Sequence, residues 1–350
     1  MRYILSAVLV VAAVLLLVEP AAVGEAVAAA VGSCLEVMIP SLFAFTVLAV
    51  YLQNSGLYRV ALRPLTLPLS ILLRIDEELC AVFVLGNIGG YPVGARLLDG
   101  LVRQGRLSAY HASRLLCCCY GSGPSFIISI AGMRVFGSAQ AGMVLFAACF
   151  LSSIVVGIFV CRFGERIELQ QTQLNYDLSA ACFVSSVMSA ARVMYTVCAM
   201  IVGFSAVTAL LDITGVTGMA ERLFGSAAVF QALMEISRVQ IMAAHGEYAF
   251  GLCGALLSFG GVCVVMQVVA LTSGRVPLKG FLLSRIPAAV LSAVTAEFLR
   301  RLFGVQAEVH SQAVFAHQTA SQMFSVNAGM SACVLIMCGM LLGMEKRRKM

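Results

Sequence analysis

Long apolar stretches recur along this sequence of 350 residues, and they constrain its fold more than any other feature. A helix that crosses a bilayer needs about 20 consecutive apolar residues. The composition points the same way, because 61% of the residues are hydrophobic and only 11% are charged. A soluble fold could not cover so much apolar material with polar surface, so we expect an all-α, polytopic membrane protein. The stretches expected to form full spans are 3–18, 33–52, 139–161, 188–211, 281–299 and 325–344.

Glycine, proline or polar residues interrupt the other apolar segments, which are 78–97, 108–133, 226–244 and 248–273. Segments 108–133 and 248–273 are long enough to span, and we expect them to be broken helices. The ten residues from Glu78 to Asn87 form only about 15 Å of helix, half of the ~30 Å hydrocarbon core. Segments 78–97 and 226–244 are therefore predicted to be re-entrant hairpins. The expected fold has about eight transmembrane helices plus two such hairpins.

The distribution of basic residues favours this topology. With the N-terminus inside and each hairpin entering and leaving on one side, fifteen Lys and Arg residues lie inside. Outside lie Arg134, Arg222, Arg300 and Arg301. A full span in place of either hairpin would weaken this asymmetry. We expect a multi-pass protein of the cell membrane with both termini in the cytoplasm.

The order of the segments repeats once along the chain. Residues 33–161 and residues 188–300 each read as span, hairpin, broken span and span. The first unit starts outside and the second starts inside, so the two repeats are inverted. Residues 85–89 align with residues 233–237, and residues 121–124 align with residues 258–261. Inverted repeats with discontinuous helices are typical of transporters, whose binding site lies at the midplane between the repeats.

The repeats set the expected domain boundaries. An N-terminal signal-anchor helix with its connection precedes them, and a polar linker separates them. The expected domains are 1–32 (anchor and connection), 33–161 (first repeat), 162–187 (linker), 188–300 (second repeat) and 301–350 (loop, last transmembrane helix and basic cytoplasmic tail).

Cysteine, histidine and net charge argue against cofactor and nucleic-acid chemistry. None of the 13 cysteines forms a C-x-x-C pair, and Cys117, Cys118 and Cys119 are consecutive in an apolar run. Free cysteine there behaves as a small buried hydrophobe. The four histidines form no ligand pattern, so we expect no metal and no cofactor. The net charge of +6 reports membrane orientation, because no basic stripe with interleaved aromatics is present.

The tip of the first hairpin is a candidate binding site, formed by Asn87, Gly89, Gly90 and Tyr91. Asn87 would lie near the bilayer midplane. The half-helix that follows would direct its positive dipole end toward an anionic or carbonyl group. The structural alternative is that the glycines allow close helix packing and Asn87 caps the half-helix.

Glu235 is the corresponding residue of the second hairpin, followed by Ser237. A carboxylate within an apolar segment is costly, which makes it a functional candidate by default. It would bind a cation, take up a proton, or accept hydrogen bonds from a polar solute. The structural alternative is a local pair with Arg238, three residues later.

The two broken spans offer further polar groups. Ser122 and Ser125 flank Gly123 and Pro124 in the first, and Gln267 follows the Gly260-Gly261 pair in the second. Close packing of helices at small residues explains both breaks equally well. An intramembrane hydrolase using Ser122 and His245 is a weaker alternative, because no zinc motif and no paired intramembrane aspartates occur. We therefore expect that the protein is not an enzyme.

Three motifs resemble the YlbJ family of sporulation integral membrane proteins. They are residues 38–43 (Met-Ile-Pro-Ser-Leu-Phe), residues 90–96 (Gly-Tyr-Pro-Val-Gly-Ala-Arg) and residues 122–127 (Ser-Gly-Pro-Ser-Phe-Ile). Residues 258–262, with Gln267 and Arg285, resemble the second half of that family. The chain departs from the family pattern at Ala44, Gly89 and Val239.

The resemblance implies the nucleoside recognition or Gate domain of that family, and a role in spore cortex formation. We expect a transporter-like core that binds or moves a small polar solute, nucleoside-like by this resemblance. Coupling to Na⁺ or H⁺ would pass through Glu235. The expected partners are the lipid bilayer, the solute, and either a second copy or other sporulation membrane proteins. The alternative function is a non-transporting scaffold that assembles cortex-building proteins.

Overall fold

The computed structural model describes residues 2–163, 165–170, 176–239 and 249–305. These residues are helical with connecting turns, and they contain no strand, which confirms the all-α fold. The predicted last span at 325–344, most of the loop before it, the basic tail, residues 240–244 of the second hairpin, and His245 lie outside the described residues.

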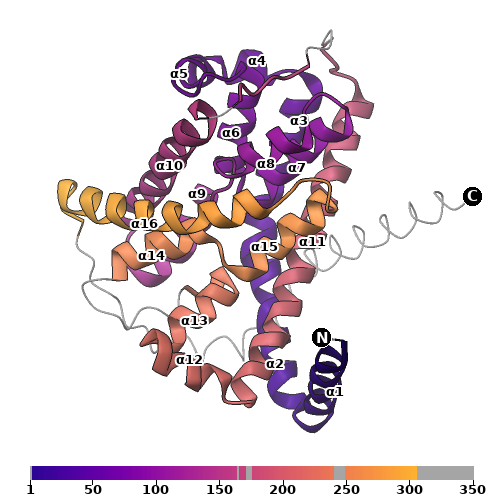
Figure 1. Cartoon of the computed structure of the whole chain (residues 1–350), viewed down its shortest axis with the longest axis vertical. Helices are drawn as coiled ribbons and strands as arrows, with labels where there is room; N and C mark the ends of the chain where they lie inside the picture. The colour runs from indigo at the N-terminus through magenta and orange to yellow at the C-terminus, as the bar shows by residue number, and fades with distance from the viewer. Residues whose placement is uncertain (1, 164, 171–175, 240–248, 306–350) are drawn as a thin grey trace, which may run out of the picture. The chain divides into compact units, whose positions relative to one another are not determined.

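The first part of the chain contains the elements drawn from indigo to magenta in Figure 1. In chain order they are α1 (Arg2–Val18), α2 (Pro20–Ser33), the π-helical turn η1 (Cys34–Met38), α3 (Ile39–Ser55), α4 (Tyr58–Ala61), α5 (Arg63–Leu73), α6 (Glu77–Gly89), α7 (Tyr91–Arg103), α8 (Ala109–Leu116), α9 (Pro124–Phe126), the π-helix η2 (Ile127–Val135) and α10 (Ala139–Arg162).

The second part follows the polar linker. Its described elements are α11 (Ala180–Ile213), α12 (Val216–Phe224), α13 (Ala227–Met234), a short 3₁₀ turn at 236–239, α14 (Ala249–Phe259), α15 (Gly261–Thr272) and α16 (Lys279–Leu302). Below, the first half means residues 33–161 and the second half means residues 188–300.

The chain is a multi-pass membrane protein. Within the described residues, five helical segments are long and apolar enough to cross a bilayer: Pro20–Met38, Ala139–Arg162, Ala180–Ile213, Ala249–Thr272 and Lys279–Leu302. In the first of them, residues 20–32 were expected as a connection and residues 33–38 as the start of the span 33–52. Pro20 at the helix start and the alanines after it favour a helix. The total of eight spans stays a prediction.

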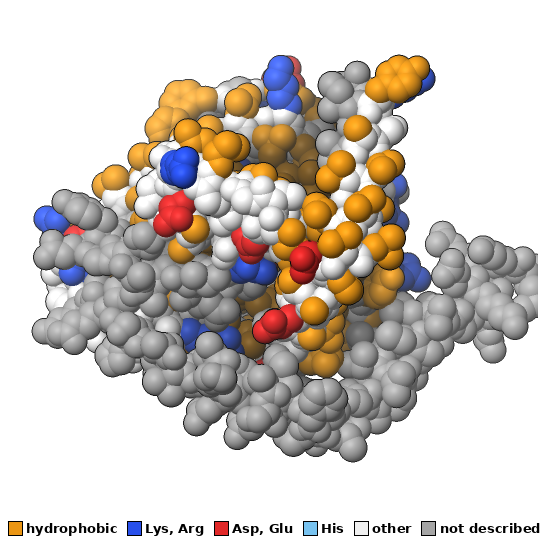
Figure 2. All heavy atoms as spheres, turned by 90° about the horizontal axis from the view of Figure 1, so that it is seen from below, with side chains coloured by type: hydrophobic (Ala, Val, Ile, Leu, Met, Phe, Trp, Pro, Cys, Tyr) orange, Lys and Arg blue, Asp and Glu red, His pale blue; other side chains and the backbone are white. Residues whose placement is uncertain are grey.

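The lipid-facing surface follows helical periodicity, as α16 illustrates. Its large apolar residues Leu283, Ile286, Val290, Val294 and Phe298 are exposed along one side. The opposite side is buried, and it is lined by small or polar residues that include Ala288, Ser292 and Ala296. Small residues on the inner side let helix backbones approach closely in a membrane. Figure 2 shows another face, where hydrophobic side chains are widely spread over the described part and several acidic and basic side chains lie among them.

The predicted first hairpin is a pair of packed helices, α6 and α7, joined at Gly90. Gly90 has a φ of 94°, which a residue with a Cβ adopts only with strain. The helix runs through Gly86, Asn87 and Gly89, so Gly90 alone makes the break. Gly86 and Gly94 let α6 and α7 approach, because a Cβ on Gly86 would lie 2.9 Å from the Gly94 Cα.

Both predicted broken spans are discontinuous. The first unwinds at 117–123, between α8 and α9. The second breaks at Gly260, between α14 and α15, where Gly260 and Gly261 have φ values of 87° and 79°. After the breaks, α9 begins at Pro124 and α15 begins at Gly261. The alignment of residues 121–124 with residues 258–261 pairs these two helix starts with each other.

Helices of equivalent position in the two halves pack on each other. Helix α3 packs on α11, and α10 packs on α16; in the predicted repeats these pairs are the first and the last spans of the two halves. The linker joins several helix ends at one end of the bundle. Arg114 donates to the carbonyl oxygen of Glu165 (2.5 Å), the Gln170 amide donates to that of Arg106 (2.9 Å), and the Asp177 amide donates to that of Ser55 (3.2 Å).

Candidate functional site

The unwound segment 117–123 of the first half meets the end of α14 in the second half. Because α14 stops at Phe259, its last carbonyl groups have no intrahelical partner. The Tyr91 hydroxyl donates to the Leu257 carbonyl oxygen (2.5 Å), and the Tyr120 hydroxyl donates to that of Phe259 (3.2 Å). The Ser122 hydroxyl lies 3.1 Å from the Leu257 oxygen and also within hydrogen-bond distance of the Tyr91 hydroxyl. First-half hydroxyls thus satisfy two of these carbonyls.

Arg285 of α16 satisfies carbonyls from both breaks. Its guanidinium donates to the Cys117 oxygen, just past the end of α8, and to the Ser258 oxygen at the end of α14 (3.4 Å). The same group lies over the rings of Tyr120 and Phe281, 4.7 and 4.9 Å from their centroids. No carboxylate pairs with Arg285 within the described residues, although its side chain is only 2% exposed. Two helix C-termini and two aromatic faces stabilise this buried cation.

A small cavity lies where α3, α7, α9, α11, α15 and the Glu235 turn meet. Its volume is about 30 Å³, which is room for a water molecule but not for an organic solute. Six of the predicted site residues line it: Gly90, Tyr91, Ser122, Glu235, Ser237 and Gln267. The remaining wall is mainly apolar and includes Leu42, Phe126 and Ile201. The fold therefore brings polar groups of both halves to one buried place.

Glu235 lies between the end of α13 and the short turn at 236–239. Its carboxylate accepts a hydrogen bond from the Ser237 backbone amide (2.9 Å) and another from the Ser237 hydroxyl. No ion pair joins Glu235 to Arg238 in the described structure. Arg238 instead lies 3.5 Å from the Gln231 side-chain oxygen and 3.4 Å from the Ser205 hydroxyl. The structural alternative, an ion pair with Arg238, is therefore absent from the described residues, and Ser237 supplies the side-chain and backbone donors to Glu235.

Three predicted site residues lie away from this cavity. Asn87 is in the last turn of α6, and its side-chain amide donates to the Phe83 oxygen (2.9 Å) and to the Cys118 oxygen (3.0 Å). It ties the hairpin to the unwound segment and caps neither half-helix. Gly89 is the last residue of α6, and a Cβ at this position would contact the Val93 side chain. Ser125 is a half-buried residue of α9, outside the cavity wall.

Arg285 and Tyr120 organise the breaks, yet neither was predicted as a site residue. A signal for Arg285 was present, because a lone arginine in the middle of an apolar segment indicates a functional role by default. Tyr120 gave no such signal next to the three cysteines. No group of three His, Cys, Asp or Glu residues that could hold a metal ion occurs in the part of the chain that the structure describes.

Comparison with known proteins gives one informative relative. The chain is 30% identical over 136 residues to the sporulation integral membrane protein YlbJ of Bacillus subtilis (strain 168). The match covers 38% of this chain and 33% of that protein, so the chain spans about a third of the relative's length. No family model matches the chain. No solved structure matches it either.

Proposed function

We propose that this chain is a sporulation-associated membrane protein, acting in spore cortex formation, whose core binds or moves a small polar solute. The observation that carries the transport proposal is the buried cavity that brings Tyr91 and Ser122 of the first half to Glu235 and Gln267 of the second. The sporulation role rests on the similarity to the sporulation integral membrane protein YlbJ.

The packing of the two halves supports a transporter-like core. Two inverted repeats related by a two-fold axis would pair their first spans with each other and their last spans with each other. The pairs α3–α11 and α10–α16 have this arrangement. Both halves also contain a discontinuous helix, and such helices usually form the binding site where inverted repeats meet. We therefore keep the Gate-type architecture, with two re-entrant hairpins and cytoplasmic termini, as part of the proposal.

The cavity wall indicates the chemistry of the solute. One carboxylate, one carboxamide and three hydroxyl groups line it, and no Lys, Arg or His does so among the described residues. Such a wall favours a neutral or cationic solute with N–H and O–H donors, and a nucleoside fits this description. Because the cavity holds only about one water molecule, solute binding requires the surrounding helices to separate. In this proposal Na⁺ or H⁺ coupling passes through Glu235.

The first test is complementation of a strain that lacks the gene, with heat-resistant spores counted and membrane abundance measured. We expect Glu235→Gln and Gln267→Leu to be present in the membrane but to lose the spore phenotype. Glu221→Gln, which changes an exposed carboxylate on α12, is the matched control and should complement fully. Full complementation by both cavity variants would favour the scaffold function instead.

The second test measures transport directly. Purified protein in proteoliposomes should take up tritiated uridine, and Glu235→Gln should lower that uptake about tenfold relative to Glu221→Gln, equivalent to about 1.4 kcal/mol. Uptake by the unsubstituted protein should also depend on a Na⁺ or H⁺ gradient. Equal uptake by empty liposomes and by protein-containing liposomes would remove the nucleoside class from the proposal.

A further inference from the structure

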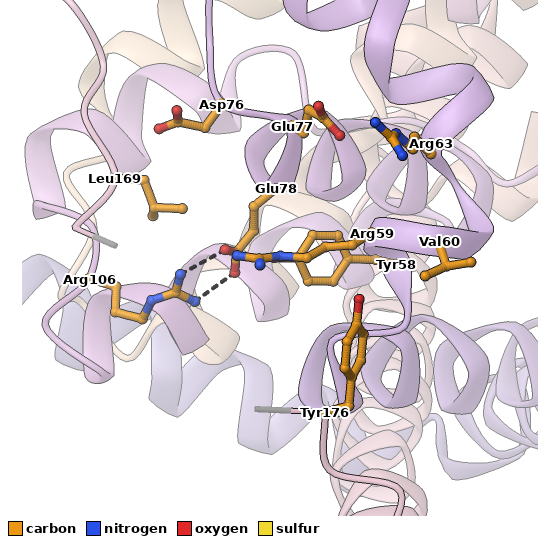
Figure 3. A pocket seen from close by; sticks show the side chains of 10 residues that line it. All are labelled: Tyr58, Arg59, Val60, Arg63, Asp76, Glu77, Glu78, Arg106, Leu169 and Tyr176. Atoms are coloured by element: carbon orange, nitrogen blue, oxygen red, sulfur yellow. Dashed lines mark hydrogen bonds and ion pairs between the residues drawn. The ribbon is translucent and has the colours of Figure 1, made fainter. Parts of the chain in front are cut away.

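A second and much larger cavity lies at the end of the bundle where the linker is attached. Its volume is about 500 Å³, and α4, the start of α5, the start of α6 and the linker form its walls (Figure 3). This end carries many of the basic residues that the positive-inside rule places in the cytoplasm. The cavity shares no residue with the small cavity near Glu235.

One ion pair of this cavity is structural. Both oxygens of Glu78 accept hydrogen bonds from the Arg106 guanidinium, at 2.6 and 2.7 Å, as the dashed lines in Figure 3 mark. Both side chains are buried. These hydrogen bonds raise the pKa of Arg106, so the guanidinium keeps its charge. The Arg106 Nε, also buried, has no hydrogen-bond partner among the described residues.

The other four charges around the cavity remain available. Arg59 and Arg63 come from α4 and α5, and Asp76 and Glu77 come from the start of α6. None of the four forms an ion pair in the described structure, and Arg59 donates only to the Tyr58 hydroxyl (3.2 Å). In Figure 3 Asp76 lies on one side of the view, Glu77 lies near Arg63, and the Arg59 side chain extends toward Glu78. Two cationic and two anionic groups therefore surround one space.

The surface next to the cavity is apolar. Helix α5 has 11 residues, too few to cross a bilayer, and it exposes Leu65 (50%) and Ile71 (76%). Val60, which is 65% exposed, continues this surface to the cavity wall. A short helix with an exposed apolar face lies in the membrane interface. This would place the opening of the cavity at the depth of the lipid headgroups.

We propose that this cavity binds the headgroup of a zwitterionic phospholipid that carries a primary ammonium. The phosphodiester would lie against Arg59 and Arg63, because guanidinium groups bind phosphate oxygens in a bidentate manner. The ammonium would donate to the carboxylates of Asp76 and Glu77. The acyl chains would lie along Val60, Leu65 and Ile71. This site goes beyond the proposed transport function and does not depend on it.

The test uses the full-length protein in detergent, titrated with short-chain phosphatidylethanolamine and followed by native mass spectrometry. We expect phosphatidylethanolamine to bind at least five times more tightly than phosphatidylcholine, whose trimethylated ammonium cannot donate hydrogen bonds. The double variant Arg59→Gln, Arg63→Gln should lose this binding about tenfold. The double variant Asp76→Asn, Glu77→Gln should lose the preference over phosphatidylcholine, because the ammonium then has no carboxylate to which it can donate.

The matched control is the double variant Glu221→Gln, Arg222→Gln on α12, which removes one charge of each sign outside the cavity and should leave binding unchanged. All six altered residues are at least partly exposed, so folding should persist. Equal binding of phosphatidylcholine, or unchanged binding by both cavity variants, would overturn the proposal. Equally tight binding of glycerophosphoethanolamine, which has no acyl chains, would make the ligand a soluble zwitterion and would also overturn it.

Discussion

Arg285 is a buried cation whose partners are backbone carbonyls rather than a carboxylate. Those carbonyls lie at the ends of α8 and α14, where the helix dipoles concentrate negative charge. In a membrane such carbonyls need a donor from within the protein, because no water replaces it. One planar guanidinium spans both breaks and stacks on Tyr120 and Phe281 at the same time.

Replacement of Arg285 should therefore destabilise the protein. Arg285→Gln leaves at least one buried carbonyl without a donor, which costs about 1–3 kcal/mol. Arg285→Lys should rescue little, because an ammonium lacks the planar fork and the stacking face. Thermal unfolding in detergent measures both, with Arg192→Gln, an exposed arginine of α11, as the control. A melting temperature for Arg285→Gln equal to that of the control would contradict this role.

Gly94 shows how tightly the hairpin packs on the unwound segment. A Cβ at this position would overlap the Cys119 carbonyl oxygen. Backbone cannot move aside easily, so Gly94→Ala should cost about 1–3 kcal/mol or more and lower membrane abundance. Gly203→Ala is the control, because nothing lies within 4 Å of a Cβ there and the helix gains about 0.5–1 kcal/mol. Equal melting temperatures for the two variants would show that the observed packing at Gly94 is wrong.

At the scale of elements, each break leaves backbone groups that another element must satisfy. The ends of α8 and α14 receive donors from α6, α7 and α16, and from the unwound segment itself. The breaks are therefore held by specific hydrogen bonds. Gly90 and Gly260, which have positive φ values, are the positions where the chain direction changes. Movement that enlarges the small cavity would have to exchange some of these hydrogen bonds.

The α6–α7 pair makes a prediction about membrane sidedness. If the pair is re-entrant, the residues before and after it lie on the same side of the membrane. Val60→Cys and Gln104→Cys should then react with a membrane-impermeant maleimide from the same side, above the labelling of the unsubstituted protein. Gln140→Cys, at the start of α10, should react from the other side. Labelling of Val60→Cys and Gln104→Cys from opposite sides would make one of the two helices a full span.

At the scale of the whole molecule, a single ion pair within the described residues joins the two halves. Asp99 of α7 is fully buried, and it accepts hydrogen bonds from Arg275, which follows α15, at 3.0 and 3.2 Å. Asp99 also pairs with Arg103 of its own helix at 2.6 Å. Because Arg275 is partly exposed, solvent screening reduces the strength of the link between the halves.

A double-mutant cycle measures this link. Asp99→Asn and Arg275→Gln, alone and combined, should show a coupling free energy of about 0.5–1 kcal/mol in thermal unfolding. Arg103→Gln, combined with Arg275→Gln, provides the control for the contribution within α7. Additive effects of Asp99→Asn and Arg275→Gln would mean that the ion pair does not hold the halves together.

Much of the architecture could be predicted from local features of the chain. Apolar length predicted the membrane class and most long helices, and the Gly and Pro clusters predicted where helices break. The predictions were less accurate where one residue decides between helix and turn. Asn87 was expected at the hairpin tip, but the helix continues past it to Gly89 because only Gly90 has a positive φ. Residues 20–32 were expected as a connection and lie in α2.

The sequence by itself determined that this protein is helical, membrane-embedded and interrupted at specific glycines, because transfer of apolar side chains into lipid and backbone freedom are local properties. Only the tertiary structure decided which groups meet at the breaks. Tyr91 and Leu257 are 166 residues apart, and Arg285 and Cys117 are 168 residues apart. The hydrogen bonds between them depend on helix packing across the molecule, which no local pattern in the chain encodes.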